Sequence, residues 1–290
     1  MATLKAGRGK APVDGGEVAY LIQGAGMPLA TAHPYATPKT GVGEFAGIAT
    51  ITVWPRGFGD SSKARGREDY GFWRLAADLD AVRRHLGLER WAFWGTSMGG
   101  FTGLVYALDY QDTLVALILD STAGSHRYRD DPDSIWPKIR KTPQSAAYYG
   151  SPSWKTFTDF FVETFRAQGV PDPARAWEQR MKEWDMHPDA LPEILRRMSE
   201  FDTAPRLAEL RIPTLIFQGG KDLQCPTTQG QTLHREIPGS LYEFFRNTGH
   251  GVLAPGRPGA VPEEWRRAVV VATAFLERAY AASGFAKVAG

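Results

Sequence analysis

A serine between glycines is the residue in this chain best placed to act as a nucleophile. Ser97 lies in the segment Gly-Thr-Ser-Met-Gly at residues 95–99, directly after the apolar run at 91–94 and directly before a helical pattern. The order strand, tight turn, helix exposes a serine hydroxyl at the apex of the turn, and small flanking residues let the strand and the helix approach each other closely. We therefore expect Ser97 to present its hydroxyl to an open cleft.

A serine hydroxyl is a weak nucleophile without a base, and the base needs an acid that orients it. Asp222 follows a β-branched and aromatic run at 213–218 and a glycine pair, and His250 follows a similar run at 241–246 through a short loop. Both side chains are thus predicted at the C-terminal tips of strands. Asp120 ends a further strand-like run and is a second candidate for the acid, because a carboxylate there can reach the same histidine. We favour Asp222.

Two further motifs occur upstream of the serine. His33-Pro34 follows the strand-like residues 28–32, and Arg-Gly-Phe-Gly-Asp-Ser at 56–61 follows the β-branched run at 48–54. These motifs, and the order Ser, Asp, His along the chain, are similar to those of the α/β-hydrolase family, which usually has His-Gly at the first motif and R-G-x-G-x-S at the second. The chain resembles that family over nearly its whole length.

The resemblance implies a role for each candidate. Ser97 would be the nucleophile, His250 the general base and later the general acid, and Asp222 the group that fixes the imidazole tautomer and stabilises the imidazolium. The backbone N–H groups of Met98 and Tyr35 would form the oxyanion hole. The resemblance thus implies acyl transfer. No histidine has a partner at metal-ligand spacing, so we expect no metal, and we expect no cofactor.

The loop that follows the first motif departs from the family pattern. Pro34 stands where the family usually has glycine, and proline has a fixed φ and no N–H to donate. The loop must therefore turn by another route, with Tyr35 as the expected donor and Ala36 as the alternative. His33 is expected to hold this loop beside the substrate.

Composition limits the class of protein. The 290 residues are 43% hydrophobic and 23% charged, with a net charge of +2, which is typical of an ordinary soluble globular protein. The basic residues are scattered, so we expect no nucleic-acid partner, and no apolar stretch is long enough to span a bilayer. The single cysteine, Cys225, rules out an internal disulfide and favours the cytoplasm. Monomer and homodimer both remain open.

Strand and helix patterns alternate along most of the chain. Short β-like runs occur at 17–23, 28–33, 48–54, 90–94, 115–120, 213–218 and 241–246. Helical patterns occur at about 70–87, 98–110, 202–210, 227–236 and 262–281. This alternation predicts an α/β fold with a mostly parallel central sheet flanked by helices.

The alternation stops between about 123 and 203, where the pattern is helical only. Four helices are predicted there, at 135–149, 154–168, 172–186 and 191–202, separated by breaks that contain proline. We therefore expect a core formed by residues 1–122 and 204–290 and an inserted helical cap at 123–203. The cap is rich in aromatic and methionine side chains, some of which should line an apolar pocket. The residues expected to contact the substrate are Trp136, Tyr149, Trp154 and Trp184.

These observations favour a serine hydrolase that cleaves carboxylic esters of small to medium apolar substrates. A narrower resemblance, to proline iminopeptidases, makes an aminopeptidase the alternative, in which cap carboxylates would hold the free amino terminus of the substrate. The glutamates available for that role are Glu163, Glu178, Glu183, Glu193 and Glu200. A lactonase and a non-catalytic small-molecule receptor are further alternatives. Dehalogenases and epoxide hydrolases of this fold use an aspartate nucleophile, so Ser97 argues against both.

Overall fold

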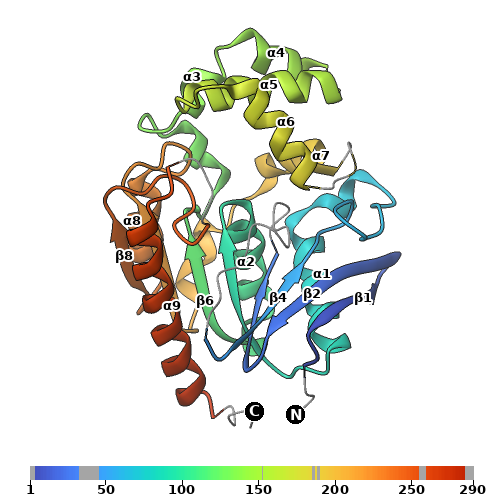
Figure 1. Ribbon diagram of the computed structural model, residues 1–290, viewed down its shortest axis with the longest axis vertical. Helices are drawn as coiled ribbons and strands as arrows, with labels where there is room; N and C mark the ends of the chain where they lie inside the picture. Colours follow the sequence, from blue (N-terminus) through green and yellow to red (C-terminus); the bar gives the residue numbers. More distant parts are fainter. Residues whose placement is uncertain are drawn as a thin grey trace.

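The computed structural model describes residues 4–32, 46–151, 153–184, 187, 190–254 and 259–284, with the backbone alone at 183, 184 and 191. Within these ranges, eight strands form one sheet in the order β1-β2-β4-β3-β5-β6-β7-β8 (Figure 1). The strands are β1 (Gly7–Val13), β2 (Gly16–Gly24), β3 (Met27–Thr31), β4 (Ile48–Val53), β5 (Trp91–Thr96), β6 (Leu114–Asp120), β7 (Thr214–Gly219) and β8 (Leu241–Phe245). β1, β2 and β4 pair antiparallel, and every other pair is parallel. The predicted fold class is confirmed.

Helices cover both faces of the sheet. Helices α1 (Phe72–His85), α2 (Met98–Asp109) and α8 (Thr227–Glu236) pack on one face, and α9 (Pro262–Ala282) packs on the other. Side chains along β5 alternate between the two cores, with Trp91 and Phe93 in one and Ala92 and Trp94 in the other. Because both faces are covered, all six residues of β5 are buried, which explains why the central strands have continuous apolar sequences.

Among the described residues, five α-helices lie between β6 and β7 in the chain. They are α3 (Trp136–Ile139), α4 (Pro143–Gly150), α5 (Trp154–Ala167), α6 (Pro173–Trp184) and α7 (Ala190–Arg197). Figure 1 shows them together at the top, beyond one end of the sheet, and we call them the helical layer. Their interior is aromatic: the ring centroids of Tyr148 and Phe160 are 5.2 Å apart, and those of Phe161 and Trp177 are 4.8 Å apart. No helix among the described residues is both long and apolar enough to cross a membrane.

The structure corrects three sequence-based predictions. Strand β1 was not expected, because it is a polar edge strand that contains Pro12 and buries little more than Ala11. The helix predicted at 202–210 is a short 3₁₀ segment, Ala204–Glu209. The helix predicted at 135–149 divides into α3 and α4, because Thr142 caps α4 by accepting a hydrogen bond from the Ser145 N–H and Pro143 occupies its first position.

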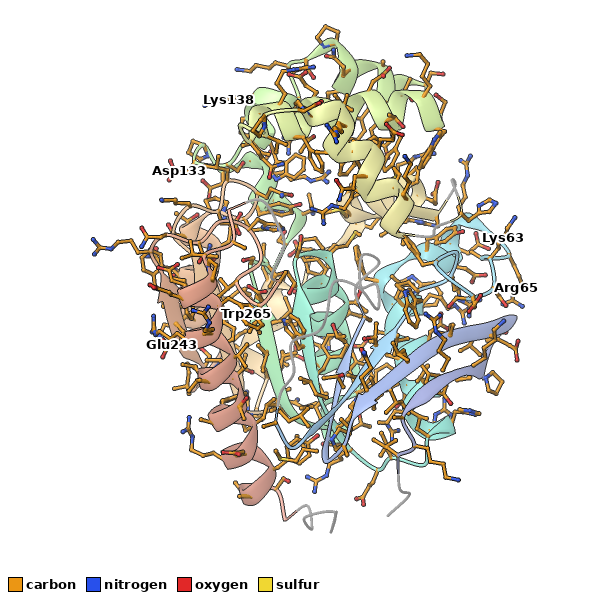
Figure 2. All side chains as sticks on the ribbon, viewed as in Figure 1. Lys63, Arg65, Asp133, Lys138, Glu243 and Trp265 are labelled. Atoms are coloured by element: carbon orange, nitrogen blue, oxygen red, sulfur yellow. The ribbon has the colours of Figure 1, made fainter. Side chains whose placement is uncertain are left out.

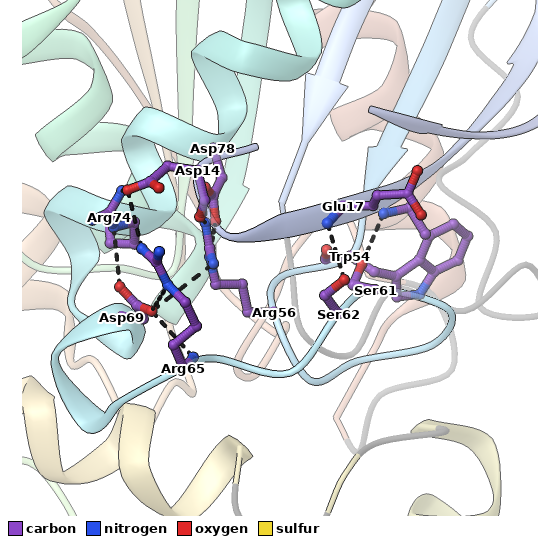
Figure 3. A network of polar contacts seen from close by, with 11 residues as sticks. Asp14, Glu17, Trp54, Arg56, Ser61, Ser62, Arg65, Asp69, Arg74 and Asp78 are labelled. Atoms are coloured by element: carbon purple, nitrogen blue, oxygen red, sulfur yellow. Dashed lines mark hydrogen bonds and ion pairs between the residues drawn. The ribbon is translucent and has the colours of Figure 1, made fainter. Parts of the chain in front are cut away.

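The Arg-Gly-Phe-Gly-Asp-Ser motif is a buried structural junction (Figure 3). Arg56 is fully buried and binds Asp78 through two hydrogen bonds, from Nε at 2.7 Å and from Nη2 at 2.8 Å. Nη2 also donates to the carbonyl oxygen of Asp14 at 2.7 Å, and Asp69 lies 4.0 Å from Nη1. The guanidinium thereby links α1 to the turn between β1 and β2.

The serine of the same motif fixes a neighbouring strand. Ser61 Oγ accepts a hydrogen bond from the Ala19 N–H and donates one to the Trp54 carbonyl oxygen, both at 2.8 Å. The exposed Asp60 lies 3.8 Å from Arg8 of β1. The motif therefore organises the end of β4 against β2.

Candidate active site

Ser97 adopts a strained backbone conformation between β5 and α2. Its φ and ψ angles are 55° and −121°, and such a positive φ is unfavourable for a residue with a side chain. Two hydrogen bonds hold the residue there: the Ser97 N–H donates to the Asp120 carbonyl oxygen at 2.9 Å, and Thr122 Oγ1 donates to the Ser97 carbonyl oxygen at 2.8 Å. The serine therefore sits at the apex of a sharp turn from strand to helix, as the sequence predicts.

Glycines permit the close approach that this turn requires. A Cβ atom on Gly95 would lie 2.4 Å from the carbonyl oxygen of Gly99, and one on Gly100 would lie 2.5 Å from Thr122 Oγ1. Real Cβ atoms do not come so near to other heavy atoms. Larger residues at these positions would push β5 and α2 apart and move the serine.

Asp222 and His250 form a buried pair. His250 Nδ1 lies 2.9 Å and 3.0 Å from the two carboxylate oxygens of Asp222. Asp222 Oδ1 also accepts hydrogen bonds from the backbone N–H groups of Gln224 at 2.8 Å and Cys225 at 2.9 Å. A carboxylate held in this way favours the imidazole tautomer with a proton on Nδ1, which leaves Nε2 as the basic nitrogen.

Asp120 accepts hydrogen bonds from hydroxyl and backbone N–H groups, whereas Asp222 contacts the imidazole of His250. Its carboxylate oxygens accept hydrogen bonds from Thr96 Oγ1 at 2.8 Å and from the N–H groups of Val252 at 2.9 Å and Leu253 at 3.1 Å. The neighbouring Ser121 Oγ accepts a hydrogen bond from the Gly251 N–H at 2.9 Å. The end of β6 therefore holds the three residues that follow His250.

One pocket brings Ser97 and His250 together. Met98, the first residue of α2, also lines it. The other described lining residues are Tyr128, Arg129, Trp136, Phe161, Thr164, Phe165, Gln168, Arg180, Leu195, Met198 and Gln224. Most of them belong to the helical layer or to the segment that joins it to β6. The candidate nucleophile and base thus share a pocket whose wall the helical layer supplies.

The predicted substrate-binding residues are placed differently from one another. Trp136 lines the pocket, and its Nε1 donates a hydrogen bond to the Gln224 carbonyl oxygen at 2.9 Å. Tyr149 is not among the lining residues, although its hydroxyl accepts a hydrogen bond from Arg129 at 3.1 Å. Trp154 is 40% exposed and packs on Phe157, away from the lining set. His33, Pro34, Tyr35, Ala36 and the side chain of Trp184 lie outside the described residues.

Sequence reasoning missed the charge of the pocket. Phe161, Phe165 and Met198 supply the expected aromatic and methionine wall, but Arg129 and Arg180 line the same pocket. No aspartate or glutamate belongs to the described part of the lining. Arg129 comes only nine residues after the end of β6, and pockets of open α/β sheets form at such strand ends. The position of Arg129 shortly after a strand end could therefore have identified it as a pocket residue from the sequence.

The glutamates considered for an amine site point elsewhere. Glu178 pairs with Lys182 at 2.7 Å, Glu193 with Arg196 at 3.4 Å, and Glu200 with Arg197 at 2.5 Å. Glu163 pairs with Arg166, and the side chain of Glu183 lies outside the described residues. None of the four described glutamates lines the pocket.

Comparisons with known proteins agree with the α/β fold. Residues 44–256 match the model of a family described as the alpha/beta hydrolase fold. A proline iminopeptidase from Saccharolobus solfataricus is 26% identical over 255 residues, which are 80% of this chain and 81% of that protein. A bromoperoxidase from Bacillus anthracis has a TM-score of 0.72 at 24% identity, covering 93% of this chain and 99% of its own. A thermophilic esterase from Thermogutta terrifontis has a TM-score of 0.70 at 23% identity, covering 94% and 99%.

Proposed function

The chain belongs to the α/β-hydrolase fold family, and from that premise we propose that it is a serine hydrolase that cleaves carboxylic esters through an acyl-enzyme. One observation carries the proposal. The strained Ser97 and the imidazole of His250, which is paired with Asp222, line the same pocket. A serine, a histidine and a carboxylate in these relations are the parts that nucleophilic acyl transfer needs.

The proposed reaction has two halves. Ser97 Oγ attacks the ester carbonyl carbon while His250 Nε2 takes the hydroxyl proton, and the resulting imidazolium is stabilised by Asp222. The imidazolium then gives its proton to the departing alkoxide, so that an alcohol leaves and the acyl group stays on Ser97. In the second half, His250 removes a proton from water, the hydroxide attacks the acyl carbon, and Ser97 leaves with the proton as the carboxylic acid is released.

The oxyanion of each tetrahedral intermediate needs hydrogen-bond donors. We assign the first to the backbone N–H of Met98, because the first N–H groups of a helix have no partner within the helix and lie at its positive end. The second donor is proposed to come from Tyr35, with Ala36 as the alternative. One such donor typically contributes about 3 kcal/mol to the stabilisation of the transition state.

We also propose that residues 123–203, which contain the helical layer, act as a cap over the acyl part of the substrate. The support is that Trp136, Phe161 and Phe165 lie on the same pocket as Ser97. Apolar walls of this kind suit small to medium acyl groups. The single cysteine, Cys225, is buried and forms no disulfide, and a cytoplasmic location is part of the proposal.

An aminopeptidase is the second candidate, because curated relatives of this chain carry the name proline iminopeptidase. The site favours an ester over an amine-bearing peptide. A protonated amine would meet two guanidinium groups and no carboxylate among the described lining residues, and like charges repel. A lactonase would use the same residues, and a receptor would keep the pocket without turnover.

Fluorophosphonate labelling tests the proposed function. The probe should modify Ser97, as peptide mass spectrometry would show, and Ser97→Ala should lose both the label and turnover of p-nitrophenyl butyrate by several orders of magnitude. Ser199→Ala, which removes another serine of the chain, should keep both. Turnover of the ester by Ser97→Ala would refute the nucleophile, and a preference for proline p-nitroanilide over the ester would favour the aminopeptidase.

A further inference from the structure

Arg129 is a cation on the pocket wall that has no carboxylate partner among the described residues. Its Nε donates to Tyr128 Oη at 3.3 Å, Nη1 to Tyr149 Oη at 3.1 Å, and Nη2 to Met198 Sδ at 3.4 Å. The guanidinium carbon also lies 4.8 Å from the ring centroid of Trp136. The described partners of Arg129 are neutral groups, so they fix the side chain without balancing its charge.

The nearby acidic residues are engaged elsewhere. Asp130, the next residue in the chain, pairs with Arg140 at 2.5 Å. Asp131 accepts hydrogen bonds from Thr228 and from Gln229, the latter at 2.9 Å. Burial raises the pKa of Tyr128, so this phenol stays neutral as well. An arginine side chain remains protonated in proteins, so the pocket carries a positive charge.

The donors of Arg129 are only partly used. A guanidinium has five N–H groups, and the three described contacts take one each from Nε, Nη1 and Nη2. One N–H on each terminal nitrogen is left, which is the pattern that binds the two oxygens of a carboxylate. Arg180 adds a second guanidinium to the lining, and Gln168 and Gln224 add amides that are joined by a hydrogen bond of 3.0 Å.

We infer that the substrate carries a carboxylate in its acyl part and that Arg129 binds it. The inference rests on the proposed function, which places the acyl part in this pocket. The inferred carboxylate narrows the substrate class from apolar esters to half-esters of dicarboxylic acids. The methylene groups of such substrates would contact the aromatic wall. Arg129 is then a specificity-determining residue rather than a member of the catalytic triad.

Paired substrates test this inference. The mono-p-nitrophenyl esters of glutaric, adipic and suberic acid would each be compared with the same ester bearing a terminal carboxamide in place of the carboxylate. A hydrogen-bonded charge pair predicts that kcat/KM for the acid exceeds that for the amide about tenfold or more at the best chain length. A ratio near one at every length would overturn the inference.

Variants separate recognition of charge from a structural role. Arg129→Met should bring the acid-to-amide ratio of kcat/KM close to one, and Arg129→Lys should keep part of the preference for the acid. Arg127→Met, at an exposed arginine two residues away, should leave the ratio unchanged. If Arg129→Met instead lowers both substrates equally and keeps the ratio, Arg129 only supports the fold and the inference fails.

A binding measurement distinguishes failure of this inference from failure of the proposed function. If no ester is cleaved and Ser97 takes no label, the proposed function fails, and calorimetric titration with adipic acid monoamide still tests the charge. Binding to the wild type that Arg129→Met abolishes would support the carboxylate site. Failure of the wild type to bind, or equal binding by the variant, would contradict it.

Discussion

Two buried carboxylates, Asp222 and Asp120, lie near the ends of neighbouring strands and hold different partners. Asp222 contacts the imidazole of His250, whereas Asp120 accepts hydrogen bonds from the backbone that follows this histidine. The first arrangement favours one tautomer of the His250 imidazole, and the second holds the backbone that follows His250 in place. The two carboxylates should therefore fail in different ways when they are replaced.

Asp222→Asn should lower kcat for a p-nitrophenyl ester about 10⁴-fold, because the amide favours the wrong imidazole tautomer. Asp120→Asn should instead reduce the free energy of unfolding by about 1–3 kcal/mol, because an amide NH₂ would face backbone N–H donors. Steady-state kinetics and urea unfolding would measure the two effects. A larger loss of kcat in a folded Asp120→Asn than in Asp222→Asn would reverse the assignment.

Sequence alone could predict the candidate residues that lie within motifs. Ser97 was predicted from its flanking glycines, and Asp222 and His250 from the strands before them. Arg129 could not be predicted in this way, because its role depends on which charges surround it after folding. Its neighbours Tyr149 and Met198 are 20 and 69 residues away along the chain. The apolar composition of the cap gave the opposite expectation.

At the scale of elements, buried polar contacts and small residues fix how the strands and helices meet. Arg56 joins α1 to the turn after β1, and Gly95 lets β5 approach α2. The elements with strong periodic patterns were predicted from sequence to within a few residues. β1 was not predicted, because it is a polar edge strand that is held by its pairing with β2. The break between α3 and α4 was also not predicted, although Thr142-Pro143 is a helix start signal.

Arg56→Met should destabilise the fold strongly, because it leaves the buried Asp78 without its cation. The free energy of unfolding should fall by about 3–5 kcal/mol, and the double variant Arg56→Met/Asp78→Leu should recover a large part of that loss. Urea denaturation of both variants would measure the difference. No loss in the single variant, or no recovery in the double variant, would show that the ion pair does not stabilise this junction.

At the scale of the molecule, the sheet supplies the candidate catalytic residues and the helical layer supplies the wall around them. The alternation of strands and helices was enough to predict this α/β architecture from sequence. How the helical layer meets the sheet was not predictable, since it depends on long-range packing. Figure 2 shows charged side chains of both signs at the outside of the molecule, with Lys63 and Arg65 at the right of the view and Lys138 and Asp133 at the left.

If the cap contacts the acyl group, kcat/KM should depend on the length of the acyl chain. Across neutral p-nitrophenyl esters from acetate to octanoate, each buried methylene should contribute about 0.8 kcal/mol, so kcat/KM should rise a few-fold per carbon until the pocket is full. Trp136→Ala should weaken this dependence, since Trp136 lines the pocket. Trp154→Ala is the control, because Trp154 is exposed and does not line the pocket, and it should leave the dependence on acyl length unchanged. Activity that ignores acyl length would remove this role from the cap.

The central claim is that the acyl group passes through Ser97, and trapping it there is the most direct test. The enzyme would be mixed with excess p-nitrophenyl butyrate, quenched in acid during turnover and digested for mass spectrometry. The account predicts a butyryl group on the peptide that contains Ser97, together with an initial burst of p-nitrophenol, and neither in Ser97→Ala. Continued turnover with an unmodified Ser97, or a butyryl group on another residue, would contradict the account.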